Sequence, residues 1–84
     1  MVHGFNSDVD YNGSNFHIQT EDWGVTNPFI VSRVYKNGAV MRSFKTAYSE
    51  ISINPLLADD RAIVSAVKYQ HQKILDLLLS GQLL

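Results

Sequence analysis

Apolar and polar residues alternate along the first half of the chain, and two Asn-Gly pairs interrupt the alternation. A period of two is typical of strands that bury one face, and Asn-Gly readily adopts the positive φ angles of a tight hairpin turn. The pattern predicts an antiparallel meander of four strands, at about residues 5–11, 15–21, 29–36 and 39–45. The third strand is apolar on both faces, which indicates a central position. In the fourth, Val40 and Phe44 are expected on the face opposite Met41 and Ser43.

The second half of the chain changes to a helical period. A core stripe with steps of three and four is expected within residues 59–80, at Val64, Val67, His71, Ile74, Leu75 and Leu78. Asp59 or Asp60 is suited to cap this helix, and Gly81 to end it. We therefore predict one α+β domain over residues 1–84, in which a four-stranded antiparallel β-meander packs against one long C-terminal α-helix.

The composition limits the classes of function. The chain has 84 residues, a net charge of −1 and no cysteine. This charge argues against nonspecific binding of nucleic acid, which requires a basic surface. A lack of cysteine excludes disulfides and thiolate chemistry and fits a reducing compartment. Because the sequence also has neither a membrane-spanning apolar stretch nor the features of a signal peptide, we expect a cytoplasmic protein.

The charged residues are distributed unevenly. Four acids and no Lys or Arg precede Arg33, whereas four bases and no acid lie between Arg33 and Lys45, both included. One interpretation is that these charges neutralise each other across neighbouring strands. The other is a polarised sheet that attracts a charged partner.

Several segments of the sequence carry a resemblance. They are residues 11–24, which include the motif His-Ile-Gln-Thr-Glu-Asp-Trp-Gly, the Asn-Pro-Phe of residues 27–29, the Val-Tyr-Lys-Asn-Gly-Ala-Val of residues 34–40, and Gln70-His71. Together they resemble a small, uncharacterised bacterial domain that occurs alone or attached to repeat and signalling modules. This resemblance implies no catalytic residues. In size and general make-up the chain has a looser likeness to the polarity adaptor RomX, which works with a Ras-like GTPase.

Two histidines and a carboxylate raise the question of a metal site. His17 and Glu21 share one face of the second strand, and His71 lies on the buried face of the helix. If Phe16 faces the helix, however, His17 and His71 lie on opposite sides of the sheet. We therefore predict no metal and no other cofactor, and we expect His71 to be hydrogen-bonded to a strand or linker group.

A single helix leaves the other face of a four-stranded sheet uncovered, which makes that face a candidate docking surface. We expect Trp23, Arg33, Tyr35 and Arg42 to lie there, because Trp, Tyr and Arg dominate interface hot spots. For Trp23 the alternative is a lid over the edge of the core.

The helix end offers a second candidate surface. The apolar band widens there to include Leu77, Leu79, Leu83 and Leu84, which is more than one sheet easily covers. These leucines either contact a partner or a second copy, or they pack within the domain.

These features predict a small non-enzymatic adaptor that binds another protein, and the resemblance implies a role in signalling or in small-GTPase-linked polarity control. The sequence has no nucleophile turn and no glycine-rich phosphate loop, so no catalytic residues are proposed. The alternatives are a small-ligand or metal-binding module and a structural homodimer.

Overall fold

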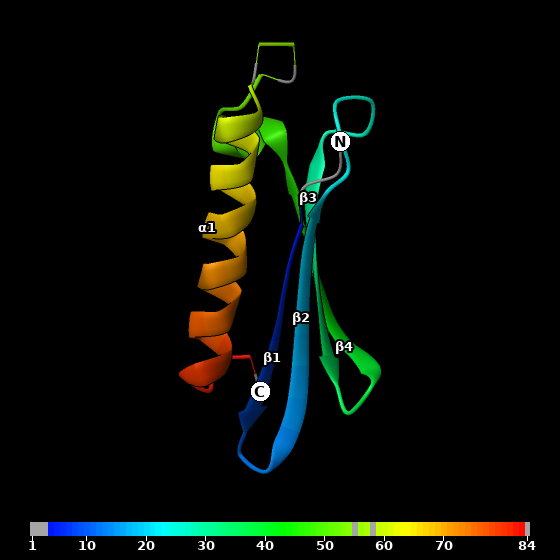
Figure 1. Cartoon of the computed structure of the whole chain (residues 1–84), viewed down its shortest axis with the longest axis vertical. Coiled ribbons are helices and arrows are strands. Elements are labelled where there is room, and N and C mark those ends of the chain that lie inside the picture. Colours follow the sequence, from blue (N-terminus) through cyan, green and yellow to red (C-terminus); the bar gives the residue numbers. More distant parts are fainter. Residues whose placement is uncertain (1–3, 55, 58, 84) are drawn as a thin grey trace.

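The computed structural model describes residues 4–54, 56–57 and 59–83. Its elements are β1 (Gly4–Tyr11), β2 (Ser14–Asp22), β3 (Phe29–Lys36), β4 (Ala39–Ala47), the short 3-10 helix η1 (Tyr48–Ile51) and α1 (Asp60–Leu79). The strands form one antiparallel sheet in the order β1-β2-β3-β4, and α1 packs against one of its faces (Figure 1). The predicted α+β meander is confirmed, and all predicted element ends lie within two residues of the observed ones.

Both hairpins close with the predicted turns. The φ angles are 53° and 79° at Asn12 and Gly13, and 49° and 88° at Asn37 and Gly38. Positive φ at both central positions is the geometry of a type I′ turn, whose twist matches that of the flanking strands. These turns fix the register of β1 on β2 and of β3 on β4.

The helix α1 begins after Asp59, whose carboxylate accepts a hydrogen bond from the Ala62 backbone N–H at 2.9 Å. Its buried residues follow the predicted steps of three and four: Ile63, Val67, His71, Ile74 and Leu78. Val64 and Leu75, which the sequence placed in the stripe, are partly buried at its margin. The core face is therefore rotated slightly from the predicted one, toward Ile63.

The chain reverses direction at the end of α1. Gly81 has a φ angle of 80°, and its N–H bonds to the Leu78 carbonyl at 3.0 Å, while the Gln82 N–H bonds to the Leu77 carbonyl at 2.9 Å. This pair of bonds is a Schellman motif, which satisfies the last helix carbonyls and turns the chain back. The turn brings Leu83 into the core, where only 8% of it is exposed.

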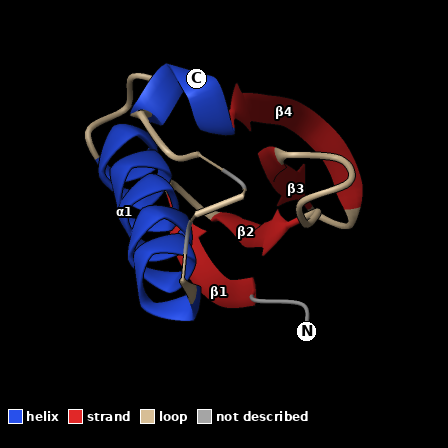
Figure 2. Ribbon diagram, turned by 90° about the horizontal axis from the view of Figure 1, so that it is seen from above, coloured by secondary structure: helices blue, strands red, loops and turns tan. Residues whose placement is uncertain are grey.

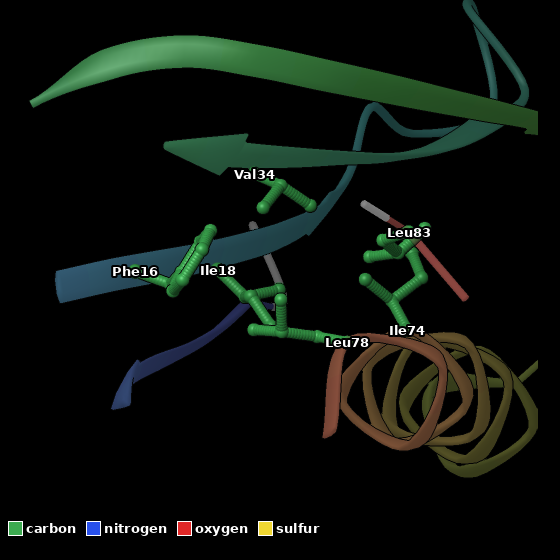
Figure 3. Packing of buried hydrophobic residues seen from close by; sticks show 6 residues of the cluster. All are labelled: Phe16, Ile18, Val34, Ile74, Leu78 and Leu83. Atoms are coloured by element: carbon green, nitrogen blue, oxygen red, sulfur yellow. The ribbon is translucent and has the colours of Figure 1, made fainter. Parts of the chain in front are cut away.

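The core lies between α1 and the sheet in two clusters. Near the C-terminal end of the helix, side chains from β2, β3, α1 and the returning chain pack together (Figure 3): Phe16, Ile18, Val34, Ile74, Leu78 and Leu83. Near the other end, the cluster consists of Ile30, Tyr48, Ile63 and Val67. A layer of polar side chains separates these two clusters.

The helix covers only part of the sheet. It packs mainly on β2 and β1, while β4 lies on the far side of the curved sheet (Figure 2). The central position predicted for β3 is confirmed, because Ile30 and Val34 are fully buried on the helix side and Val31 is 4% exposed on the other. The helix side of β4 is left without a helix above it.

An irregularity in β4 changes which face its residues occupy. Val40 pairs with Tyr35 and Arg42 pairs with Val34, so Met41 is an extra residue in β4. Such a bulge breaks the alternation of side chains. The prediction that Val40 and Phe44 share a face is therefore wrong: Val40 lies on the outer face, and Phe44 packs toward the core.

Candidate functional site

Trp23 is the centre of an aromatic and charged cluster on the outer face of the sheet, the face away from α1. Its Nε1 donates a hydrogen bond to the Glu21 carboxylate at 2.8 Å. The Arg33 guanidinium carbon lies 5.9 Å from the Trp23 ring centre, and the Lys45 ammonium lies 5.3 Å from it. Lys45 is also 4.1 Å from the centre of the Phe29 ring. We call Glu21, Trp23, Phe29, Arg33 and Lys45 the Trp23 cluster.

Trp23 has features of both predicted roles, an interface anchor and a lid over the edge of the core. Trp23 is partly buried, and the neighbouring Val31 on the same face is only 4% exposed. Arg33 approaches the Glu21 carboxylate at 3.5 Å, so one acid serves both the indole and the guanidinium. Flat aromatic and guanidinium groups that are already held in place lose little freedom on binding, which suits an interface anchor.

Tyr35 lies on the same outer face, but beside a different set of residues. Its ring centre is 6.0 Å from that of His17. The His17 Nδ1 lies 2.9 Å from the Asp8 carboxylate, and its Nε2 lies 3.3 Å from the Asn6 side-chain oxygen. Tyr35 therefore belongs to a polar area near β1, and the sequence did not signal the contacts with Asp8 and Asn6.

Arg42 does not join Trp23, Arg33 and Tyr35, contrary to the expectation from the sequence. The bulge in β4 pairs it with Val34, whose side chain faces α1, and its guanidinium lies 5.1 Å from the centre of the Phe44 ring. Arg42 is exposed at the edge of the sheet on the helix side.

Of the four leucines in the predicted helix-end band, Leu84 lies outside the described residues, and the other three have different environments. Leu79 is 50% exposed, Leu77 is partly buried, and Leu83 lies in the core. Packing within the domain therefore accounts for most of the widened apolar band, and Leu83 is not accessible to a partner.

The residues considered for a metal site lie apart. His17 lies on the outer face of the sheet, whereas His71 belongs to α1 and contacts the opposite face of the sheet, as predicted. Glu21 is four residues from His17 along β2, which is about 13 Å in a strand. Within residues 4–54, 56–57 and 59–83, no group of three or more His, Asp or Glu side chains is arranged to hold a metal ion.

His71 is the centre of the polar layer between the two apolar clusters. Its Nε2 lies 2.8 Å from the Ser7 hydroxyl, and its Nδ1 lies 2.8 Å from the Thr20 hydroxyl. Thr20 in turn is 2.7 Å from the Ser32 hydroxyl, to which the Gln70 amide donates at 3.0 Å. The predicted hydrogen bonding of a buried His71 to strand groups is confirmed, and the chain of contacts joins α1 to β1, β2 and β3.

Burial lowers the pKa of His71 from its ordinary value of 6.5, and an electrostatic interaction with His17 lowers it further. A neutral imidazole has one donor and one acceptor nitrogen, which the two hydroxyl groups can match. Among the described residues, every buried side-chain polar atom has a hydrogen-bond partner. The polar layer is therefore a satisfied network that specifies how the helix sits on the sheet.

The contact between Ser7 and His71 does not favour nucleophilic catalysis. His71 is 6% exposed, and its second nitrogen faces the Thr20 hydroxyl, where a catalytic histidine usually has a carboxylate that stabilises its protonated form. Because the imidazole lies between helix and sheet, a substrate has no direct approach to it.

A second buried polar contact holds η1 against the end of β2. The Tyr48 hydroxyl donates to the buried Asp22 carboxylate, which also accepts the Gly24 N–H at 3.0 Å. Burial, together with the hydrogen bond to the Asp22 carboxylate and its negative charge, raises the pKa of the Tyr48 hydroxyl. Tyr48 therefore stays protonated, and its role is structural.

A groove of about 790 Å³ lies between α1 and β4, on the part of the sheet that the helix leaves uncovered. One wall includes Phe44 and Thr46 of β4, and the opposite wall includes Tyr69, Lys73 and Leu77 of α1. The sequence did not predict this groove, because it depends on which strands the helix covers.

The structure neutralises part of the charge across neighbouring strands, since Arg33 of β3 lies 3.5 Å from the Glu21 carboxylate of β2, but it separates the charges at the two sheet edges. The exposed acids Asp8 and Asp10 lie on β1, at one edge, whereas the exposed bases Arg42 and Lys45 lie on β4, at the other edge. Because β2 and β3 lie between these edges, the two sets of charges do not neutralise each other by direct contact.

No protein-family model, no curated protein and no solved structure matches this chain. None of the helices within the described residues is both long enough and apolar enough to span a membrane.

Proposed function

We propose that this chain is a small protein-binding domain, a non-enzymatic adaptor that uses the outer face of its sheet. The observation that carries this proposal is the Trp23 cluster, in which an indole and two cationic side chains are gathered on a face without a covering helix. Tryptophan and arginine at the centre of a patch are the residues that most often dominate binding energy. A cytoplasmic role in signalling or in GTPase-linked polarity control is the finer form of this proposal, and the resemblance of the sequence supports it.

The proposal is tested by affinity capture of the tagged chain in its own host, with the wild type and two variants, Trp23→Ala and Arg33→Ala. Loss of a central anchor costs about 2 kcal/mol or more, which is roughly thirtyfold in affinity. We expect both variants to recover far less of the captured protein, and titration of that purified protein to show the corresponding rise in Kd.

Lys68→Ala is the matched control, because Lys68 is exposed on α1, on the other side of the sheet. It should capture as the wild type does. If the wild type captures nothing beyond a tag-only control, or if Trp23→Ala and Arg33→Ala behave like Lys68→Ala, the outer face is not the binding surface.

A further inference from the structure

The strand β4 is an open edge of the sheet. It is the last strand in the order β1-β2-β3-β4 and pairs only with β3 among the described strands. In an edge strand, every second residue directs its N–H and C=O groups away from the sheet. Such an edge can receive an extended peptide as an additional strand, through main-chain hydrogen bonds.

The groove lies beside this open edge, on the helix side. Phe44 faces it from β4, and Tyr69 faces it from α1 with 70% of its surface exposed. Ile51 extends the apolar lining beyond the end of β4 and is 38% exposed. A strand added next to β4 continues the sheet along the groove, so every second side chain of that strand enters it.

The same edge carries a base on each side of the sheet. Lys45 lies on the outer face, in the Trp23 cluster, and Arg42 is exposed on the helix side of the same strand, beside Phe44. From Arg33 to the end of β4 the chain contains no acid, and the next one is Glu50 in η1. Exposed bases at an edge attract a negatively charged partner and speed its association.

We propose that β4 accepts an extended acidic segment of another protein as a fifth strand, with alternate apolar side chains in the groove and alternate carboxylates beside Lys45 on the outer face. This inference rests on the proposed protein-binding function and specifies the chemistry of the partner. The groove supplies affinity for apolar side chains, the edge supplies main-chain bonds, and the cations select against basic segments.

Like charges disfavour the pairing of two β4 strands from two copies of the chain. Two β4 strands that pair with each other place Lys45 and Arg42 of both copies close together, and like charges opposite one another destabilise a strand pair. The acidic β1 edge of a second copy is also a poor occupant, because its apolar side chains Phe5 and Tyr11 pack within their own domain and are not available to enter the groove.

The test titrates synthetic peptides into the isotope-labelled full chain and follows its amide signals by NMR. The acidic peptide has the length of β4, nine residues, with Glu alternating with Val, and a matched peptide has Lys in place of Glu. We expect the acidic peptide to shift the amide signals of residues 39–47 and of Tyr69. The basic peptide should bind at least about tenfold more weakly.

Backbone methylation of the peptide tests strand addition without altering the protein. One acidic peptide carries N-methyl groups on its Glu residues only, and the other carries them on its Val residues only. An added strand pairs through alternate amides, so one of these two peptides should lose binding and the other should retain it. Equal effects of the two methylation patterns would overturn the proposal, since they indicate recognition that does not use an added strand.

Protein variants locate the site. Lys45→Glu and Tyr69→Ser should each weaken the acidic peptide about tenfold, whereas Lys68→Glu, the same charge change outside the groove, should not. Circular dichroism and urea unfolding confirm that each variant is folded. The proposal is contradicted if the acidic peptide does not bind, or if neither Lys45→Glu nor Tyr69→Ser weakens its binding. It is also contradicted if the wild type has a concentration-dependent mass that Lys45→Glu abolishes, because a second copy then occupies the edge.

The two proposals fail separately. If Trp23→Ala abolishes capture in the host while Tyr69→Ser has no effect there, the protein-binding function stands and the strand-addition mode is wrong. If neither variant alters capture, both proposals are wrong.

Discussion

Replacing Thr20 by Val tests whether the buried polar layer stabilises the fold. Thr20 is fully buried, and its hydroxyl lies 2.8 Å from the His71 Nδ1 and 2.7 Å from the Ser32 hydroxyl. Valine has nearly the same shape as threonine, so the substitution removes these hydrogen bonds without leaving a cavity. The variant therefore reports on the polar contacts and not on packing.

The expected loss of stability follows from the hydrogen bonds that remain in the variant. Ser32 keeps its contact with the Gln70 amide at 3.0 Å, but the buried His71 Nδ1 loses its partner. A buried polar group without a partner costs about 1–3 kcal/mol, so we expect the free energy of unfolding to fall by about 2 kcal/mol. For a domain of this size, that lowers Tm by about 8–16 °C.

Urea and thermal unfolding, followed by circular dichroism, measure this change. Thr26→Val is the matched control, because Thr26 is exposed in the loop between β2 and β3. The stability of this variant should stay close to that of the wild type. A double-mutant cycle of Thr20→Val with Ser32→Ala should show coupling of about 0.5–3 kcal/mol, since the two hydroxyls bond to each other. A Thr20→Val variant as stable as the wild type would show that the layer contributes nothing net to stability.

Three further predictions concern pH, a turn and the η1 contact. Burial, and secondarily an electrostatic interaction with His17, lowers the pKa of His71 below 6.5, so the unfolded chain binds more protons between 6.5 and the lowered value. The stabilising contribution is therefore fully present above pH 6.5 and declines as the pH falls through that window. The free energy of unfolding, measured by urea titration at several pH values, should fall more steeply with decreasing pH in the wild type than in His71→Gln. Equal pH dependence of the two proteins would contradict the argument. Gly38→Val should lower the free energy of unfolding by about 1–3 kcal/mol, because the φ angle of 88° at this position strains a β-branched residue even though no atom lies within 4 Å of the added Cβ. Gly38→Asn should lower it less, and thermal unfolding of both variants measures the difference. Tyr48→Phe removes the hydroxyl that donates to buried Asp22 and should lower the free energy of unfolding by about 1–3 kcal/mol, and an unchanged urea midpoint would refute that role.

The strands, turns and helix were predictable because each has a local signal. Asn37-Gly38 indicates a tight turn whatever the surrounding fold, and the spacing of Val67, His71 and Ile74 marks one face of a helix. The burial of Val31 and its neighbours on both faces of β3 was visible as a continuous apolar run. Local patterns therefore sufficed for the order and type of the elements.

The bulge in β4 was not predictable from the alternation of side chains. The sequence Val40-Met41-Arg42 is compatible with a regular strand, and only the pairing with Tyr35 and Val34 reveals the additional residue. One extra residue moves every side chain beyond it to the opposite face. For this reason Arg42 was assigned to the wrong side of the sheet.

The polar layer was predictable only in part. The place of His71 in an apolar stripe signalled burial, but its partners depend on the strand register that sets Thr20 beside Ser32. A usable signal was present: both residues occupy inward-facing strand positions where an apolar side chain is usual. Polar residues at such positions on neighbouring strands indicate a hydrogen-bonded layer.

The charges at the two sheet edges explain how a sheet with an open edge avoids pairing with itself. β1 carries exposed Asp8 and Asp10, and β4 carries exposed Arg42 and Lys45, so each edge repels its own copy. Repulsion of this kind blocks the symmetric pairing of two β1 strands or two β4 strands, without closing either edge to a strand of opposite charge. The arrangement that limits the pairing of two β4 strands is therefore the same one that selects an acidic segment there.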